Sequence, residues 1–295
     1  MRKQYKIQWN NHTLNLGTKT CIMGILNITP DSFSDGGHFF NTDLAVAQAE
    51  EMAAAGADII DIGGESTRPF SDAVSSQEEN DRVLPVIEKL AEKISIPISI
   101  DTNKADVAKN ALKAGASIIN DISALGMDSE MAALAGAYDV PVILMHMKGK
   151  PKTMQVSPEY DDLIGEIKSF FKNVVDHAVK SGISRSKIII DPGIGFGKTI
   201  EHNLSLINKL DEFESLDLPI LAGSSRKAFI RNILKAPGVK DIDPMLPEVE
   251  TGTQASVAAA VMRGVHIVRV HNVANTCATV KIIDAVINEQ NLGRY

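Results

Sequence analysis

The sequence contains little cysteine, no long apolar run and no basic block. Only two cysteines occur among 295 residues, Cys21 and Cys277, which is too few for a disulfide framework or a cysteine-rich zinc site. No apolar stretch reaches the length of about 18 residues that a transmembrane helix needs. The net charge is −7 and positive charge is not clustered, which argues against nucleic acid or a membrane surface as a partner.

The composition that remains is that of a globular protein, with 44% hydrophobic and 23% charged residues. The opening residues MRKQYKIQWN contain no apolar core of a signal peptide, so the expected location is cytoplasmic. No linker-like segment interrupts the chain. We therefore expect one domain over 1–295, with a hairpin at about 5–16 and a barrel at about 20–290.

The pattern of short apolar runs predicts the fold. YKIQW and HTLNL alternate apolar and polar residues around Asn10-Asn11, which is typical of a β-hairpin. Eight β-branched runs then alternate with helix-period segments. They are TCIMGIL from Thr20, ADIIDIG from Ala57, PISID from Pro97, SIIND from Ser117, PVILMH from Pro141, KIIID from Lys187, PILAG from Pro219 and HIVRVH from His266.

Runs that are apolar on both faces and alternate with helices indicate parallel strands buried on both sides. Eight of them favour a closed (β/α)₈ TIM barrel, an α/β fold, with the hairpin covering its bottom. An open doubly wound sheet is the alternative. It normally shows a G-x-G-x-x-G turn after the first strand, and the segment after Leu26 has none. Residues 234–252 are irregular and predict a long loop.

Polar residues end all eight predicted strands. In order they are Asn27, Asp61, Asp101, Asn120 with Asp121, His146, Asp191, Gly223 with Ser224, and Arg269 with His271. Any one of them could be a simple turn-forming residue. In a barrel, however, the carboxyl ends of all strands meet at one face, where barrel enzymes carry their chemistry.

The residue types at this face divide into two groups. Asp101, Asn120 and Asp191 offer hydrogen-bond acceptors and one amide, a set that matches the N–H edge of an aminopyrimidinone ring. Arg269 and His271 follow the last strand, where barrels often bind phosphate. A salt bridge at the barrel rim is the alternative role for Arg269.

Three further segments allow more than one interpretation. Lys227 could be a Schiff-base nucleophile, a hydrogen-bond donor or a solvated lysine, and its neighbours Arg226 and loop residues favour the donor. His146 could be a metal ligand, but it lacks a second ligand at the usual spacing and is better explained as a polar strand-end residue. The segment DPGIGFGK, 191–198, is rich in glycine like a phosphate-binding Walker loop, but Lys198 lacks the spacing of that motif. Its glycines would instead allow the backbone to approach a flat ligand.

Together these motifs resemble the dihydropteroate synthase family of folate biosynthesis. The matching segments are NITPDSFSDGG, GGESTRP, SIDT, NDI, DPGIGFGK, SSRK and RVH, in this order along nearly the whole chain. The resemblance implies that 4-aminobenzoate is joined to a dihydropterin methyl diphosphate, with release of pyrophosphate and the help of Mg²⁺. It also implies a homodimer formed through the late helices.

The resemblance further implies a role for each matching residue. The pterin ring would lie against Asp101, Asn120, Asp191 and Lys227, and the diphosphate against Thr67, Arg269 and His271, with Asn27 near both diphosphate and metal. Phe33, Pro69 and Ser225 would surround 4-aminobenzoate, and Asp35 and Arg68 would join Lys227 as catalytic residues.

The segment Asn27 to Gly37 would then be a loop that closes over the bound diphosphate. Closure would exclude water from a pterin cation, and Asp35 could stabilise that cation. Two alternatives remain open, a pterin-dependent methyltransferase and a non-catalytic pterin-binding module. The first needs no phosphate clamp, and the second would be expected to lose Asp35, Arg68 and Lys227, all of which are present.

Overall fold

The computed structural model describes residues 2–29, 38–66, 74–149, 154 and 157–289. Over these residues the strands form a two-stranded antiparallel hairpin and an eight-stranded parallel sheet. The hairpin consists of β1 (Tyr5–Trp9) and β2 (His12–Leu16). The parallel strands are β3 (Cys21–Asn27), β4 (Ile59–Gly63), β5 (Ile98–Asp101), β6 (Ile118–Asp121), β7 (Val142–Met145), β8 (Ile188–Asp191), β9 (Leu221–Ala222) and β10 (Ile267–Val270).

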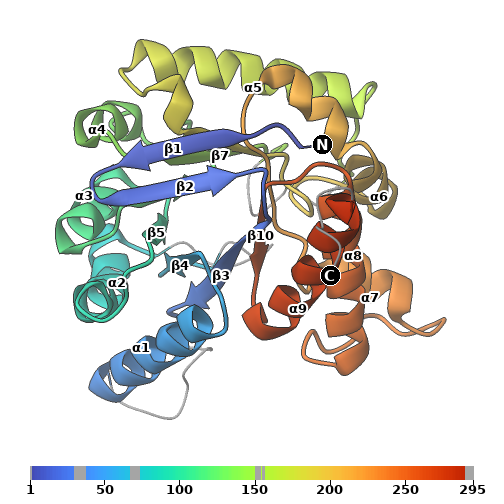
Figure 1. Cartoon of the computed structure of the whole chain (residues 1–295), viewed down its shortest axis with the longest axis horizontal. Helices are drawn as coiled ribbons and strands as arrows, with labels where there is room; N and C mark the ends of the chain where they lie inside the picture. Colours follow the sequence, from blue (N-terminus) through green and yellow to red (C-terminus); the bar gives the residue numbers. More distant parts are fainter. Residues whose placement is uncertain (1, 30–37, 67–73, 150–153, 155–156, 290–295) are drawn as a thin grey trace.

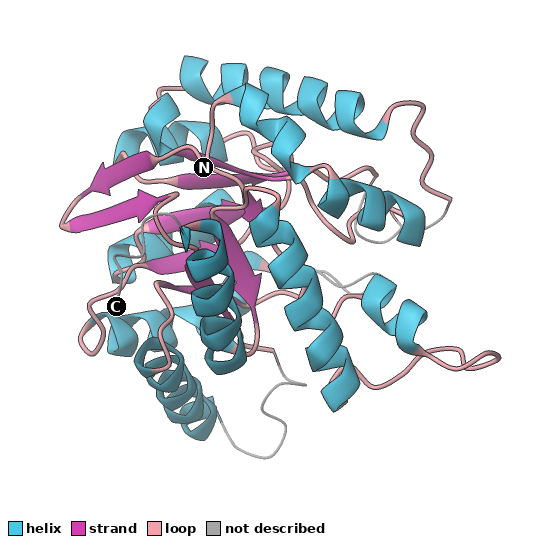
Figure 2. Ribbon diagram, turned by 45° about the vertical axis from the view of Figure 1, so that its right-hand side comes forward, coloured by secondary structure: helices cyan, strands magenta, loops and turns pink. Residues whose placement is uncertain are grey.

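Helices follow the strands and surround them on the outside (Figures 1 and 2). They are α1 (His38–Ala54), α2 (Ser76–Ala91), α3 (Ala105–Ala114), α4 (Met131–Tyr138), α5 (Leu163–Lys180), α6 (Ile200–Asn208), α7 (Ala228–Leu234), α8 (Pro247–Met262) and α9 (Val273–Ile287), with 3₁₀ turns η2 (Arg185–Lys187) and η3 (Leu210–Leu216). Within the described part of the chain, no helix combines the length and the apolar character needed to cross a bilayer.

The parallel sheet closes on itself. Its strand order is β8-β7-β6-β5-β4-β3-β10-β9, and a parallel bridge between Ile190 and Ile220 joins the two ends. The Ile190 N–H donates to the carbonyl oxygen of Pro219 at 3.0 Å across the same seam. The predicted (β/α)₈ barrel is therefore confirmed, and an open doubly wound sheet is excluded.

Burial on both faces explains the composition of the strands. Every residue of β4 to β8 is buried, including the isoleucine-rich segments of β4 and β8. One face of each strand packs inside the barrel and the other packs against the helices, so the runs are apolar without alternation. The aspartates and asparagines that interrupt these runs are consequently buried as well.

The hairpin and the first residues lie at the amino ends of the strands, as predicted. Trp9 and Leu16 are buried, while His266, just before β10, contacts the carbonyl oxygen of Lys3 through Nε2 at 3.0 Å. Nδ1 of His266 accepts the Ile220 N–H at 3.1 Å, which assigns the ring proton to Nε2. Burial lowers the pKa of His266 to about 4, so the neutral ring joins the two segments.

The predicted long loop at residues 234–252 is shorter than expected, because α8 begins at Pro247. Proline is favoured in the first turn of a helix, where its missing N–H has no intrahelical partner to lose. Glu248 and Glu250 also stand in this first turn, where their charge is favourable. The residues that suggested irregular structure in 247–252 are thus those of a helix start.

Candidate active site

Buried polar side chains converge at the carboxyl ends of the strands. Asp61, Asp101, Asn120 and Asp191 come from β4, β5, β6 and β8, and each residue is at most 7% exposed. Parallel pairing sets Asp101 directly beside Asn120 on the neighbouring strand. The predicted group of Asp101, Asn120 and Asp191 therefore belongs to one end of the barrel.

Arg269 of β10, which lies near the end of the chain, contacts two members of this group. Its Nε donates to Oδ2 of Asp61 and its Nη2 to Oδ2 of Asp101, both at 2.6 Å. The Asn120 Nδ2 also donates to Oδ2 of Asp61, at 3.0 Å. One guanidinium thus pairs two buried carboxylates that would otherwise repel each other. Burial opposes the charge on Arg269, but the facing carboxylates outweigh it and raise its pKa.

Each of these two carboxylates keeps one oxygen without a partner. Oδ1 of Asp61 and Oδ1 of Asp101 are buried and accept no hydrogen bond from any described residue. Burial also raises the pKa of Asp101 to about 7, while Arg269 acts in the other direction. Buried acceptors of this kind are costly unless a ligand or water supplies a donor.

Asp191 and Lys227 form the other half of the group. Oδ1 of Asp191 accepts the Gly193 N–H at 2.8 Å, and burial raises the pKa of Asp191. Lys227 donates to the carbonyl oxygen of Ile194, and its Nζ lies 4.4 Å from the centroid of the Phe196 ring. Burial lowers the pKa of Lys227 to about 8, so this lysine is more desolvated than its sequence neighbours suggested.

The glycine-rich segment after β8 has a structural requirement for its glycines. Gly193, Gly195 and Gly197 all have positive φ. A Cβ atom would overlap the carbonyl oxygen of His146 at the first position and the side chain of Lys227 at the second. These contacts within the chain explain why the three positions are glycines, and the approach of this backbone to a flat ligand stays a prediction.

His271 and Arg269, predicted together as phosphate ligands, have different partners. The Nδ1 of His271 lies 2.9 Å from Oγ of Ser225, and the His271 N–H also donates to this oxygen at 3.4 Å. Arg269 instead faces Asp61 and Asp101, so the rim salt bridge considered as its alternative role is present. Ser225, predicted near 4-aminobenzoate, is buried beside His271.

Asn27 is half-buried at the end of β3, where it pairs in register with Gly63 of β4. Among the described residues, no three His, Cys, Asp or Glu side chains form a group that could hold a metal ion. Mg²⁺ commonly keeps several waters and is bound through few protein oxygens plus substrate phosphates. The Asn27 amide oxygen fits that kind of site, in which the diphosphate itself would supply most of the ligands.

Five of the predicted site residues lie outside the described residues, namely Phe33, Asp35, Thr67, Arg68 and Pro69. Their roles stay predictions. Residues on the two sides of 67–73 contact each other, since Oε1 of Glu65 accepts the Val74 N–H at 3.4 Å. Lys104 joins the other oxygen of Glu65 to the fully buried Glu79, with both contacts at 2.5 Å.

Two residues of the site had been given no role from the sequence. Asp61 contacts both Arg269 and Asn120, and its signal was an aspartate at the end of the apolar run ADIIDIG. Lys198 is almost fully buried and hydrogen-bonded beneath the glycine-rich segment. Nothing in the sequence distinguished it from a solvated lysine at the start of α6.

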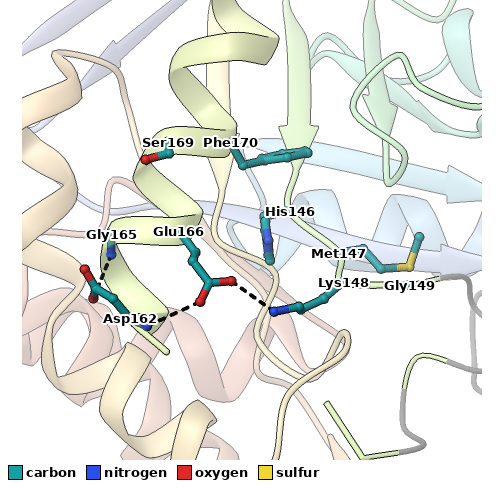
Figure 3. Close-up of a pocket in the computed structure, with 9 residues that line it drawn as sticks. All are labelled: His146, Met147, Lys148, Gly149, Asp162, Gly165, Glu166, Ser169 and Phe170. Atoms are coloured by element: carbon teal, nitrogen blue, oxygen red, sulfur yellow. Dashed lines mark hydrogen bonds and ion pairs between the residues drawn. The ribbon is translucent and has the colours of Figure 1, made fainter. Parts of the chain in front are cut away.

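A cavity of about 660 Å³ lies beside the carboxyl end of β7 (Figure 3). His146 and Phe170 line it, and Lys148 reaches Glu166 of α5 across 2.9 Å. Its lining does not include the carboxylates of β4, β5 and β8. We place the chemistry at the carboxylates, because Asp101 there combines a raised pKa with a buried oxygen that has no partner among the described residues, whereas Lys148 and Glu166 of the cavity pair with each other.

Comparison with known proteins assigns the family. Residues 23–271 match the family model described as "Pterin binding enzyme". The dihydropteroate synthase of Synechocystis is 47% identical over 270 residues, covering 92% of this chain and 91% of the relative.

Two solved structures show the same fold. The dihydropteroate synthase of Clostridium difficile, solved in the presence of pteroic acid, has a TM-score of 0.84 at 45% identity and covers 92% of this chain and 98% of its own. That of Xanthomonas albilineans with 4-aminobenzoic acid has a TM-score of 0.86 at 37% identity and covers 97% and 99%. The chain therefore belongs to the pterin binding enzyme family, and within it to the dihydropteroate synthases.

Proposed function

We propose that the carboxylate group at the barrel end binds the pterin ring of (7,8-dihydropterin-6-yl)methyl diphosphate, which the enzyme joins to 4-aminobenzoate. The single observation that carries this assignment is the buried Oδ1 of Asp101, which lacks a donor among the described residues. An aminopyrimidinone edge carries N–H and NH₂ donors, which would satisfy such an acceptor.

The remaining ring contacts follow from the chemistry of the neighbouring groups. Asn120 supplies an amide oxygen beside Asp101, and Asp191 supplies a carboxylate oxygen from β8. We assign Lys227 as the donor to a ring acceptor, because its Nζ donates to the Ile194 carbonyl and lies near the Phe196 ring, and a charged ammonium carries two further N–H donors. A partly desolvated ammonium makes stronger hydrogen bonds than a solvated one. Pteroic acid, present with the related Clostridium enzyme, contains a pterin ring of the same kind.

The diphosphate would lie between β3 and β10. Asn27 and His271 stand at the ends of these strands, and Thr67 completes the predicted group. Arg269 has Nε and Nη2 engaged by carboxylates, and we assign it both to the ring pocket and to the adjacent phosphate. The guanidinium offers five N–H donors, so one residue can serve both.

4-Aminobenzoate would bind outside the pterin, against Ser225, Phe33 and Pro69. The Xanthomonas enzyme solved with 4-aminobenzoic acid supports this class of ligand for a relative. Asp35 and Arg68 would complete the closed site. Each of these assignments, Ser225 apart, falls on residues outside the described part of the chain and rests on the sequence motifs alone.

The reaction we propose is dissociative. The bond from the pterin methylene carbon to the diphosphate oxygen breaks first, its electron pair leaves with pyrophosphate, and the amine nitrogen of 4-aminobenzoate then attacks the cationic methylene and loses a proton. Asp101 and Asp191 stabilise the positive charge that spreads into the ring. Mg²⁺, when bound with the diphosphate near Asn27, would neutralise charge on the leaving group.

A homodimer and a cytoplasmic location complete the proposal. Ile282 and Val286 of α9 are 66% and 54% exposed, one helical turn apart, and Met262 at the end of α8 is 55% exposed. An exposed apolar strip on two adjacent helices is typical of a two-fold interface. The cytoplasm is proposed because a diphosphate ester does not cross a bilayer unaided.

Pyrophosphate release tests the proposed function. The purified chain is mixed with both substrates and Mg²⁺, and pyrophosphate and 7,8-dihydropteroate are quantified. We expect the two products in equal amounts, and no 7,8-dihydropteroate when 4-aminobenzoate is omitted. A chain that binds the pterin but forms no product with both substrates would contradict the proposal and favour a binding module.

A further inference from the structure

Lys198 is a buried lysine whose Nζ has three hydrogen-bond partners. Burial lowers the pKa of Lys198 to about 7, while the charge of Asp191 acts in the other direction. The residue is 2% exposed. The Nζ atom donates to the carbonyl oxygens of Gly193 at 2.9 Å and Phe196 at 3.0 Å, and it lies 3.1 Å from Nδ1 of His146. Nζ therefore connects the turn between Gly193 and Phe196 to His146, the residue that follows β7.

The turn that Lys198 holds carries contacts to both Asp191 and Lys227. Gly193 donates its N–H to the Asp191 carboxylate at 2.8 Å. The Ile194 carbonyl accepts from Lys227, and the Phe196 ring lies 4.4 Å from its Nζ. The two residues assigned to the ring on this side of the barrel thus take their immediate neighbours from one short segment.

His146 is the third partner of the Lys198 Nζ, and its Nδ1 accepts a hydrogen bond when Lys198 is charged. Its ring packs edge-on against Phe170, with centroids 4.9 Å apart, and Figure 3 shows the two rings together at the end of β7. Burial lowers the pKa of His146 to about 3, so the ring is neutral. An acceptor at Nδ1 leaves the ring proton on Nε2.

We propose that Lys198, with His146 as its acceptor, is a positioning residue for pterin binding: it fixes the turn 193–197 and thereby orients Asp191 and Lys227. The proposal rests on the ring assignment given under the proposed function. Within the turn, the Phe196 N–H donates to the Gly193 carbonyl oxygen at 3.1 Å, and the Lys198 ammonium ties this closed turn to β7. The positive φ values of its glycines make the turn dependent on such an anchor, because glycine has the most backbone freedom to lose.

Substitution of Lys198 by methionine tests the anchor. Lys198→Met keeps the length of the side chain but removes the ammonium donor from the carbonyl oxygens of Gly193 and Phe196. The probe is 6-hydroxymethylpterin, which has the ring and no phosphate, and its affinity is measured by calorimetry. We expect a loss of up to about 10²-fold in affinity, the effect of weakening a hydrogen bond between the ring and a charged group such as Asp191 or Lys227. Affinity for pyrophosphate with Mg²⁺ is expected to stay within about twofold, because its proposed ligands lie on other strands.

Lys187, the residue just before β8, provides a matched control. It is 9% exposed and donates to the Asp139 carbonyl oxygen at 2.6 Å, but it stands at the amino end of β8. Lys187→Met removes a similar buried lysine far from the ring. We expect it to lower the melting temperature and to leave 6-hydroxymethylpterin affinity unchanged. Equal loss of ring affinity in both variants would overturn the proposal, since both would then report a general loosening of the barrel.

Two further comparisons separate positioning from a purely structural role. His146→Asn keeps an acceptor near the position of Nδ1, whereas His146→Leu removes it, so the first should retain most of the ring affinity that the second loses. In a Lys227→Met background, Lys198→Met should cost clearly less ring affinity than in the wild type, because part of its action passes through Lys227. Additive losses, or identical effects of the two His146 variants, would overturn the proposal.

These readouts do not depend on turnover. If the wild type fails to release pyrophosphate from its two substrates, the proposed function fails, whatever Lys198 does. If the wild type is active and Lys198→Met binds 6-hydroxymethylpterin as tightly as the wild type, only the role of Lys198 is refuted. Should Lys198→Met not fold, the His146 pair alone decides between the outcomes.

Discussion

Replacing Asp101 by asparagine changes one atom at the centre of the proposed ring pocket. In the structure Oδ2 of Asp101 accepts from Nη2 of Arg269 at 2.6 Å, and Oδ1 has no partner among the described residues. Arg269 can only donate, so the asparagine oxygen must take the place of Oδ2. The amide NH₂ then occupies the position of the unpaired acceptor, where it faces the ring donors with donors of its own.

The expected loss follows from that mismatch. A buried hydrogen bond to a charged group is lost and two donors are opposed, which costs about 2–4 kcal/mol of binding free energy. This corresponds to an affinity for 6-hydroxymethylpterin that is about 30- to 700-fold weaker. Affinity for pyrophosphate with Mg²⁺ should change far less.

Calorimetry of the folded variant measures this directly, with Asp121→Asn as the control. Asp121 is also buried at a strand end, but it accepts from Ser123 and from the Leu125 N–H. Its substitution should reduce stability without reducing ring affinity. Unchanged ring affinity in Asp101→Asn, or an equal loss in the two variants, would refute the assignment of Asp101 to the ring edge.

The same variant has a predicted pH dependence of stability. Burial raises the pKa of Asp101 to about 7 from its ordinary value of 3.8, so the folded state retains a proton that the unfolded chain releases. The contribution of this carboxyl to stability is present below about pH 4 and is lost as the pH rises to about 7. Asp101→Asn should therefore gain stability relative to the wild type across this window, measured by urea unfolding. A relative loss would mean that the ion pair with Arg269 outweighs burial.

Three other substitutions have defined outcomes. Arg269→Met leaves Asp61 and Asp101 without their shared cation and should cost about 3–5 kcal/mol of unfolding free energy at pH 8, but less at pH 5; equal costs at both pH values would contradict the ion-pair account. Replacing residues 31–35 by glycine and serine should leave 6-hydroxymethylpterin binding intact and reduce turnover by at least about 10²-fold; near wild-type turnover would show that the segment is only a connection. Ile282→Asp on α9 should shift sedimentation from dimer to monomer, whereas Leu204→Asp, at another exposed apolar position on α6, should not; an unchanged mass would place the interface elsewhere.

The sequence predicted the barrel and much of its site because strand ends are local signals. Asp101, Asn120 and Asp191 each follow a largely apolar run, and the closure of parallel strands brings such ends to one face without further information. The start of α8 was missed for the opposite reason. Its proline and acidic residues occur in both loops and first helical turns, and only packing decides between them.

The sequence did not predict which charged side chains would pair with each other. Arg269 lies 208 residues from Asp61 and 168 from Asp101, and the motif in which it stands fitted phosphate equally well. Lys198 directly follows a glycine-rich segment, yet its burial depends on how β7 and the turn after β8 approach each other. A lysine with three internal hydrogen-bond partners has the same local sequence as a solvated one, so only the three-dimensional structure distinguishes them.

The position of Arg269 near the end of the chain has a consequence for biosynthesis. A ribosome that adds about 5–20 residues per second completes β4 and β5, with their aspartates, many seconds before β10 emerges. Until then β3 presents an unpaired edge, and Asp61 and Asp101 lack the guanidinium that pairs them in the finished barrel. A nascent half-barrel can therefore pack its apolar strands together. Its two carboxylates have to stay hydrated or protonated, because their cation is not yet present. The arrival of one arginine completes both the charge balance of the pocket and the last pairing of β3, so that assembly of the binding site and completion of the fold coincide.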